Sequence, residues 1–191
     1  MIKALLISTV LAFTGFGEAE KVKVDVDASS VNWVGKKVTG QHNGTIALQG
    51  GRLEMEEGVL TGGIFTIDMT TINCEDLSGG GKGKLEGHLK SDDFFGVETY
   101  PTATFVITKA VPQGPGNYKV VGNITIKGAT QEIQFPATLE ENGGVYTATA
   151  DLTIDRSKFD IRYGSGSFFD NLGDKTIYDD FELSVSLVTS K

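Results

Sequence analysis

The chain has 191 residues, a formal net charge of −8 and one cysteine, Cys74. An acidic surface argues against nucleic acid and anionic membranes as the main partners. Because Cys74 has no second cysteine to pair with, the fold must be stable on its core alone, and a buried Cys74 is favoured over a reactive one.

The first 19 residues have the pattern of a secretory signal peptide. Lys3 precedes an apolar run over residues 4–13, and the small residues Gly17 and Ala19 follow it. This order is typical of a cleaved signal peptide, and the run is too short to span a bilayer. We therefore predict a periplasmic or secreted protein without stable membrane insertion, in which residues 20–191 form a single domain.

Residues 22–69 alternate between apolar and polar side chains, which predicts β-strands. The apolar rows are Val22, Val24 and Val26; Val31 and Trp33; Ile46 and Leu48; and Phe65, Ile67 and Met69. The glycine pairs Gly50-Gly51 and Gly62-Gly63 are interpreted as turns between these strands.

The segment 80–91 lacks this alternation and predicts a short helix. Leu85, His88 and Leu89 fall at helical spacing, and the aromatic pair Phe94-Phe95 follows. A short helix that ends in an aromatic pair can cover one end of a barrel, so we interpret the segment as a cap.

The second half of the chain alternates more regularly. Strands are predicted within residues 101–109, 118–127, 132–139, 146–155 and 181–188. Consecutive strands with short turns form antiparallel meanders, and at least eight strands with one apolar face each form a sandwich or a barrel.

Small residues on the inward faces favour the barrel. They are Ala103, Gly122, Ala137, Ala148 and Ala150. Small side chains widen the bore, and an eight-stranded barrel can then hold one small ligand. The alternative, that these residues pack against large aromatic side chains opposite them, stays open at this point.

The long segment 164–180 has no strand pattern and contains a second aromatic pair, Phe168-Phe169. Loops of this length are usually functional or lid-like, so we expect this pair to cover one end of the barrel.

Three stretches together resemble the YceI family of exported lipid-binding proteins. They are KLEGHLKSDDFFGVETYPTATFVITKA (84–110), GNITIKGATQEIQFPATL (122–139) and IDRSKF (154–159). The resemblance implies an eight-stranded, antiparallel, lipocalin-like β-barrel with a short capping helix, which holds a polyisoprenoid or a related apolar chain. It also implies that His88, Leu89, Phe94 and Phe95 belong to the cap. The segments 34–44 and 160–180 depart from the family pattern.

The predicted ligand is a long isoprenoid, polyprenyl or quinone-type, or another lipid, bound without covalent chemistry for carriage or storage. The predicted tail contacts are Trp33, Phe65, Ile67, Phe94, Phe95, Phe105, Ile107, Ile124, Phe135, Leu152, Ile154, Phe168 and Phe169. The predicted head-group contacts are Arg156, Arg162, Tyr163 and His88. No catalytic residue, required cofactor or metal is predicted, because His42 and His88 have no third partner in the sequence pattern.

Two other function classes compete with lipid carriage. The first is an enzyme that modifies such a lipid with His88 or His42 as base. The second is a structural or interaction barrel with a solid core and no ligand. A homodimer is a further possibility that the sequence leaves open.

Overall fold

The computed structural model describes residues 19–191, so the predicted signal peptide, apart from Ala19, lies outside the described residues. The strands are β1 (Glu20–Lys37), β2 (Gly40–Glu56), β3 (Val59–Cys74), β4 (Thr102–Gly114), β5 (Asn117–Ile126), β6 (Ala129–Asn142), β7 (Val145–Asp155) and β8 (Ile177–Thr189). Helix α1 (Gly79–Lys90) joins β3 to β4, and the 3-10 turns η1 (Arg156–Phe159) and η2 (Gly173–Lys175) lie between β7 and β8. No helix in the described part of the chain is long and apolar enough to cross a membrane.

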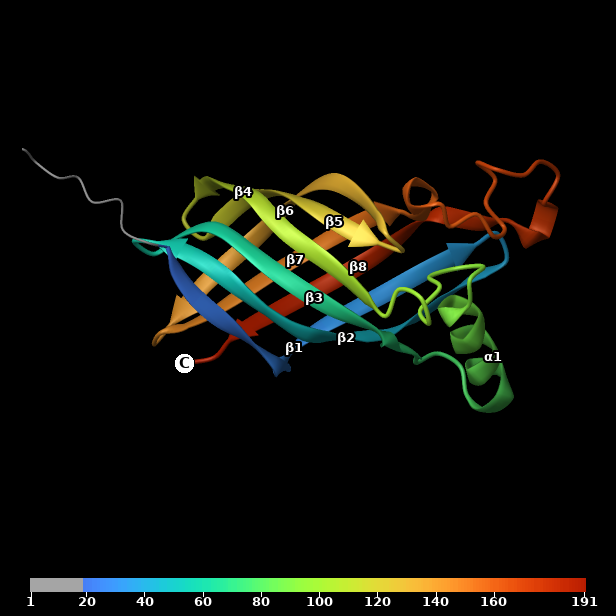
Figure 1. Cartoon of the computed structure of the whole chain (residues 1–191), viewed down its shortest axis with the longest axis horizontal. Helices are drawn as coiled ribbons and strands as arrows, with labels where there is room; N and C mark the ends of the chain where they lie inside the picture. The colour runs from blue at the N-terminus through green and yellow to red at the C-terminus, as the bar shows by residue number, and fades with distance from the viewer. Residues whose placement is uncertain (1–18) are drawn as a thin grey trace, which may run out of the picture.

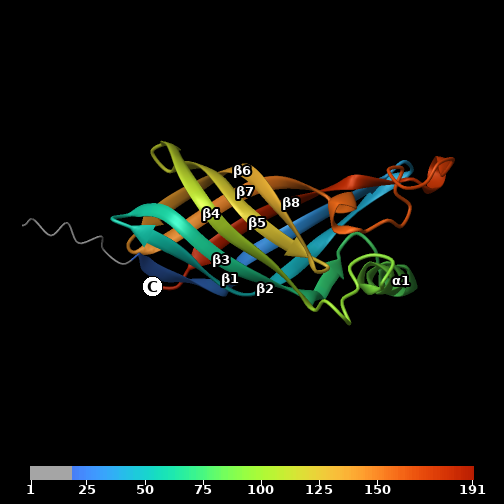
Figure 2. The same ribbon diagram turned by 45° about the horizontal axis from the view of Figure 1, so that its top comes forward.

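The eight strands form one closed antiparallel barrel, as predicted. Each strand pairs with its neighbour in the chain, and β8 pairs with β1 to close the sheet. The barrel is elongated, with α1 at one end and the C-terminus near the other (Figures 1 and 2). We refer to the end that carries α1 as the mouth.

The glycine pairs interpreted as turns lie inside strands instead. Gly50-Gly51 belongs to β2 and Gly62-Gly63 to β3, and the true turn is Glu57-Gly58. Both turn residues have positive φ, which suits a tight hairpin. A β-carbon on Gly51 would lie 2.7 Å from the Phe65 ring, so this glycine provides close approach between strands and not chain reversal.

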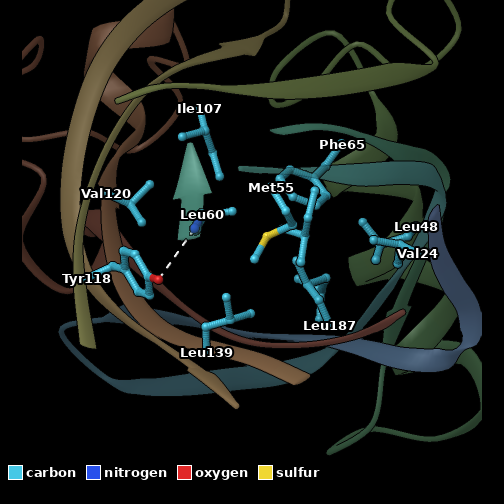
Figure 3. Packing of buried hydrophobic residues seen from close by; sticks show 12 residues of the cluster. Val24, Leu48, Met55, Leu60, Phe65, Ile107, Tyr118, Val120, Leu139 and Leu187 are labelled. Carbon is cyan, nitrogen blue, oxygen red and sulfur yellow. Dashed lines mark hydrogen bonds between the residues drawn. The ribbon is translucent and has the colours of Figure 1, made fainter. Parts of the chain in front are cut away.

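The barrel interior divides along its axis into two clusters of buried side chains. The cluster far from the mouth, which we call the packed half, includes Leu53, Met55, Leu60, Tyr118 and Leu139. Figure 3 shows such side chains pointing into the barrel, where the Tyr118 hydroxyl accepts a hydrogen bond from the Leu60 N–H at 3.4 Å. Large side chains therefore fill this half of the barrel, and any space for a ligand lies in the other half.

Candidate functional site

A cavity of about 350 Å³ lies inside the barrel at its mouth. The strands alternate, so every second side chain faces this space. Six strands and the helix contribute apolar residues to its lining: Val31, Trp33, Ile46, Ile67, Met69, Ile72, Leu85, Leu89, Ala103, Ile124, Ile126, Ile177, Phe181 and Leu183. A wall of this composition suits an apolar ligand.

Trp33 provides the largest flat surface of the cavity wall. Its indole Nε1 donates a hydrogen bond to the Thr45 carbonyl at 3.2 Å, which satisfies the one polar atom of the side chain. A β-carbon on Gly44 would lie 2.8 Å from the indole and 1.9 Å from the Asn73 carbonyl oxygen. Gly44 therefore lets β1, β2 and β3 come close enough to hold the ring in place.

An aromatic group closes one side of the mouth. The His88 ring on α1 lies 4.4 Å from the Tyr163 ring and 5.0 Å from the Phe94 ring, both in edge-to-face geometry. Phe94 is buried, and Phe95 packs edge-on against Phe181 with 6.2 Å between centroids. These contacts join α1, the segment after it and the β7–β8 connection over the cavity.

Arg156 is a buried cation at the cavity wall, with 3% of its surface exposed. Its guanidinium donates hydrogen bonds to the carbonyls of Tyr178, Ile161 and Ile177. Nη2 also lies 3.3 Å from Oδ1 of Asp179. Burial lowers the pKa of Arg156, while the Asp179 charge acts in the opposite direction. Arg156 thus ties the β7–β8 connection together and places positive charge beside an apolar space.

The rim of the mouth carries groups of both signs. Lys36, Lys37 and Asp180 line the cavity, and Lys36 forms an ion pair with Glu182. A polar end of a ligand that lies at this rim would stay near water, while its apolar part lies among the strands.

A second polar group, His42, Asp76 and Cys74, lies beside the mouth. Asp76 Oδ2 lies 2.8 Å from His42 Nδ1, and the Cys74 thiol donates to Asp76 Oδ1 at 3.2 Å. The Asn43 N–H and then His42 lower the pKa of Asp76 to about 2, whereas burial and the Asp76 contact raise the pKa of Cys74. The carboxylate lies between thiol and imidazole, which is not the arrangement that activates a thiolate.

These three side chains place donor atoms within 4.8 Å of one another. The sequence pattern offered His42 no third partner, and the fold supplies two. No spacing signal indicates this group, because His42 on β2 and Asp76 after β3 meet only through the pairing of those strands.

Eight of the predicted ligand contacts line the cavity. Those expected at the tail are Trp33, Ile67, Phe94, Phe95 and Ile124, and those expected at the head group are Arg156, Tyr163 and His88. The fold therefore brings residues from β1, β3, β5, α1 and the β7–β8 connection to one place.

The other predicted contacts lie elsewhere. Phe65 and Ile107 are buried in the packed half, Phe105 and Phe135 pack at its border, and Leu152 and Ile154 belong to the cluster near the mouth without lining the cavity. Phe168 and Phe169 are exposed, and Arg162 pairs with Asp160 and lies over the Phe168 ring. Neither Phe168 nor Phe169 lines the cavity, so the structure does not support the prediction that this pair covers the barrel end.

Several lining residues were not singled out in the sequence. Phe181, Leu183 and Met69 lie on faces predicted to point inward, so alternation indicated their direction but not their height in the barrel. Ile177 and Tyr178 lie in a segment interpreted as a loop, although β8 begins at Ile177.

Comparison with known proteins gives a consistent match. The family model of the YceI-like domain matches residues 22–189. A UPF0312 protein of Staphylococcus aureus strain USA300 is 36% identical over 85 residues, which are 41% of this chain and 47% of that protein. The chain thus spans about half the length of the curated relatives that it matches first.

Two solved structures share the fold. Burkholderia cenocepacia BcnA superposes with a TM-score of 0.70 at 27% identity, covering 87% of this chain and 99% of that one. A polyisoprenoid-binding domain from Saccharophagus degradans, implicated in plant cell wall breakdown, superposes with a TM-score of 0.64 at 16% identity, covering 88% and 97%.

Proposed function

Because the chain belongs to the YceI-like family, we propose that it binds a long isoprenoid or another lipid chain without covalent chemistry and carries or stores it outside the cytoplasm. The observation that supports this most is the apolar cavity at the mouth, which ends at the packed half. The polyisoprenoid-binding description of the Saccharophagus degradans domain supports the isoprenoid class.

In this proposal the apolar chain lies against Trp33, Ile67 and Ile124, and its polar end lies at the rim. Arg156 and Tyr163 are the polar groups nearest to that end, and Lys37 adds a second positive charge. A phosphorylated or otherwise anionic end would therefore lie beside positive charge, whereas a neutral end would meet the tyrosine hydroxyl and the histidine.

Binding explains the site better than catalysis does. His88 contacts Asp93 at 3.4 Å and two aromatic rings, and His42 is held by Asp76. Both histidines have contacts that fix them structurally at the mouth, and an apolar chain needs neither a base nor a nucleophile in order to bind.

The size of the cavity sets how much binding energy it can supply. At about 30 Å³ for each water-sized group, 350 Å³ holds about a dozen carbon-sized groups. At about 0.8 kcal/mol for each buried CH₂, these give about 10 kcal/mol gross. Loss of ligand freedom costs a comparable amount, so tight binding requires more buried chain than the cavity alone accommodates.

Trp33 tests the proposal directly, because it is the single tryptophan of the chain and it lines the cavity. Titration with a bromine-labelled prenyl or acyl chain should quench Trp33 fluorescence in a saturable way. The variant Ala103→Phe fills the cavity and should abolish saturation, whereas Val106→Phe, on the outer face of the same strand, should not. Equal quenching in both variants, or none in the wild type, would reject the proposal.

A further inference from the structure

The barrel wall is interrupted between β6 and β7. These strands pair only over five residue pairs, from Thr138 opposite Thr149 to Asn142 opposite Val145. Towards the mouth, residues 129–137 of β6 pair with β5 alone, and residues 150–155 of β7 pair with β8 alone. The two strands therefore separate along the half of the barrel that contains the cavity.

Two side-chain contacts bound the separated region. At one end the hydroxyls of Thr138 and Thr149 lie 2.7 Å apart, and at the other Gln131 Nε2 donates to the Lys158 carbonyl at 3.1 Å. We call the opening between these contacts the slit. The slit is seven residues of strand long, which corresponds to about 20 Å.

Side chains of both faces of the sheet lie at the slit. A hollow of about 740 Å³ is lined by consecutive residues of both strands, 134–138 on β6 and 149–151 on β7. Neighbouring residues of a strand point to opposite faces, so this hollow has side chains from inside and outside the barrel. Tyr118 and Val185 line it from the interior, and Lys119 lines it from the exterior.

The inner end of the cavity and the inner side of the slit are neighbours along the barrel axis. Leu183 lines the cavity, and Val185, two residues further along the same face of β8, lines the slit. Two residues correspond to about 7 Å along the strand. Phe135 lines the slit, and its ring centroid lies 5.6 Å from that of Phe105, which packs against both interior clusters.

The inward-facing side chains at the slit are apolar and only partly covered. Phe105, Phe135 and Ala137 pack against the packed half but are half-buried, unlike Ile107 and Val120 beside them. Pro136 lacks an N–H, so the free edge of β6 is a poor template for addition of a strand from another protein. The exposed apolar surface therefore suits an apolar chain better than a β-strand.

We infer that a ligand chain too long for the cavity leaves the barrel sideways through the slit, displacing the contact between Phe105 and Phe135 as it passes. This inference rests on the proposed function and adds a second binding segment for the distal part of an isoprenoid or acyl chain. The packed half blocks the axial route, and the slit is the adjacent space with an apolar inner wall.

Chain length separates this inference from the proposed function. Geraniol, with two isoprene units, fits the cavity, and geranylgeraniol, with four, needs the slit. The variant Ala150→Phe narrows the slit, and Glu132→Phe places the same ring on an exposed position of β6 that lines neither space. Ala150→Phe should weaken geranylgeraniol binding at least tenfold and leave geraniol binding unchanged, whereas Glu132→Phe should change neither.

Retention of geraniol binding in Ala150→Phe shows that the variant is folded. If that variant binds geranylgeraniol as tightly as the wild type does, the slit does not hold the chain, although the proposed function stands. If the wild type binds neither alcohol, the proposed function fails and the slit inference fails with it.

A mapping experiment on the wild type avoids any effect of substitution on folding. Geranylgeraniol with a photoreactive diazirine at its distal end should label peptides that contain Phe135, Ala137 or Ala150. Labelling of Leu53 and Met55 in the packed half, or of Phe94 at the mouth, would overturn the inference.

Discussion

The guanidinium carbon of Arg156 lies 5.5 Å from the centroid of the Phe94 ring. This cation–π contact joins the end of β7 to the segment that follows α1, at the wall of the cavity. With three backbone carbonyls and Asp179 as its other partners, Arg156 holds both sides of the mouth together.

Replacement of Arg156 by methionine should lower the free energy of unfolding by about 3–5 kcal/mol, because it leaves Asp179 and three carbonyls without their buried partner. Urea denaturation followed by far-UV circular dichroism measures this loss. The control is Arg162→Met, which removes an exposed pair with Asp160 and should cost less than about 1 kcal/mol. Similar losses in both variants would show that Arg156 has no special structural role.

Replacement of Gly44 by alanine should destabilise the barrel by at least about 2 kcal/mol, because the new β-carbon meets the Asn73 carbonyl oxygen at 1.9 Å. Thermal unfolding measures the effect, and the same change should alter Trp33 emission, since the indole lies 2.8 Å from that β-carbon. Gly50→Ala on the same strand has nothing within 4 Å and serves as the control. An unchanged melting temperature in Gly44→Ala would contradict the close approach described.

Asp76 should contribute stability that depends on pH. Its pKa is about 2 in the folded protein against 3.8 for the ordinary group, so the folded state favours the charged form. The contribution is present in full above about pH 4 and is lost as the pH falls through 2. Asp76→Asn should therefore be less stable than the wild type at neutral pH, and the difference should shrink towards pH 2.

Urea midpoints of the two proteins across this pH range measure the effect. Asp174→Asn, at an exposed position in η2, controls for the removal of one negative charge. A difference between wild type and Asp76→Asn that stays constant from neutral pH to pH 2 would rule out this contribution of the carboxylate.

Cys74 should react with Ellman's reagent only when the protein unfolds. The thiol is fully buried, and its pKa is raised by burial and by the contact with Asp76, so little thiolate is available in the folded state. The rate of modification should rise steeply across the urea transition. Rapid reaction in the absence of urea would show that the end of β3 opens readily.

The direction of most interior side chains could be predicted from the sequence, because a strand with one buried face alternates with a period of two. Phe65, Ile67, Phe105 and Ile124 all point inward as this pattern requires. Their height along the barrel could not be predicted, since the period repeats at every level. Ile67 and Ile124 therefore line the cavity, whereas Phe65 and Phe105 lie at or beyond its floor.

The prediction of turns at the glycine pairs was wrong, because glycine also occurs inside strands where two strands lie close together. Gly51 and Gly63 lie beside the Phe65 ring inside paired strands, while Glu57-Gly58 forms the hairpin. Contacts between distant segments, such as His42 with Asp76 or Gln131 with Lys158, had no local signal because they depend on the completed barrel.

The most direct measurement of the central claim is the native mass spectrum of the protein purified from its own host, followed by identification of any molecule released by organic solvent. We expect the wild type to exceed its polypeptide mass by that of an apolar chain, and Ala103→Phe made in the same host to lack this addition. A wild-type protein that is always found at its polypeptide mass, and whose Trp33 emission no prenyl or acyl chain changes, would contradict the account.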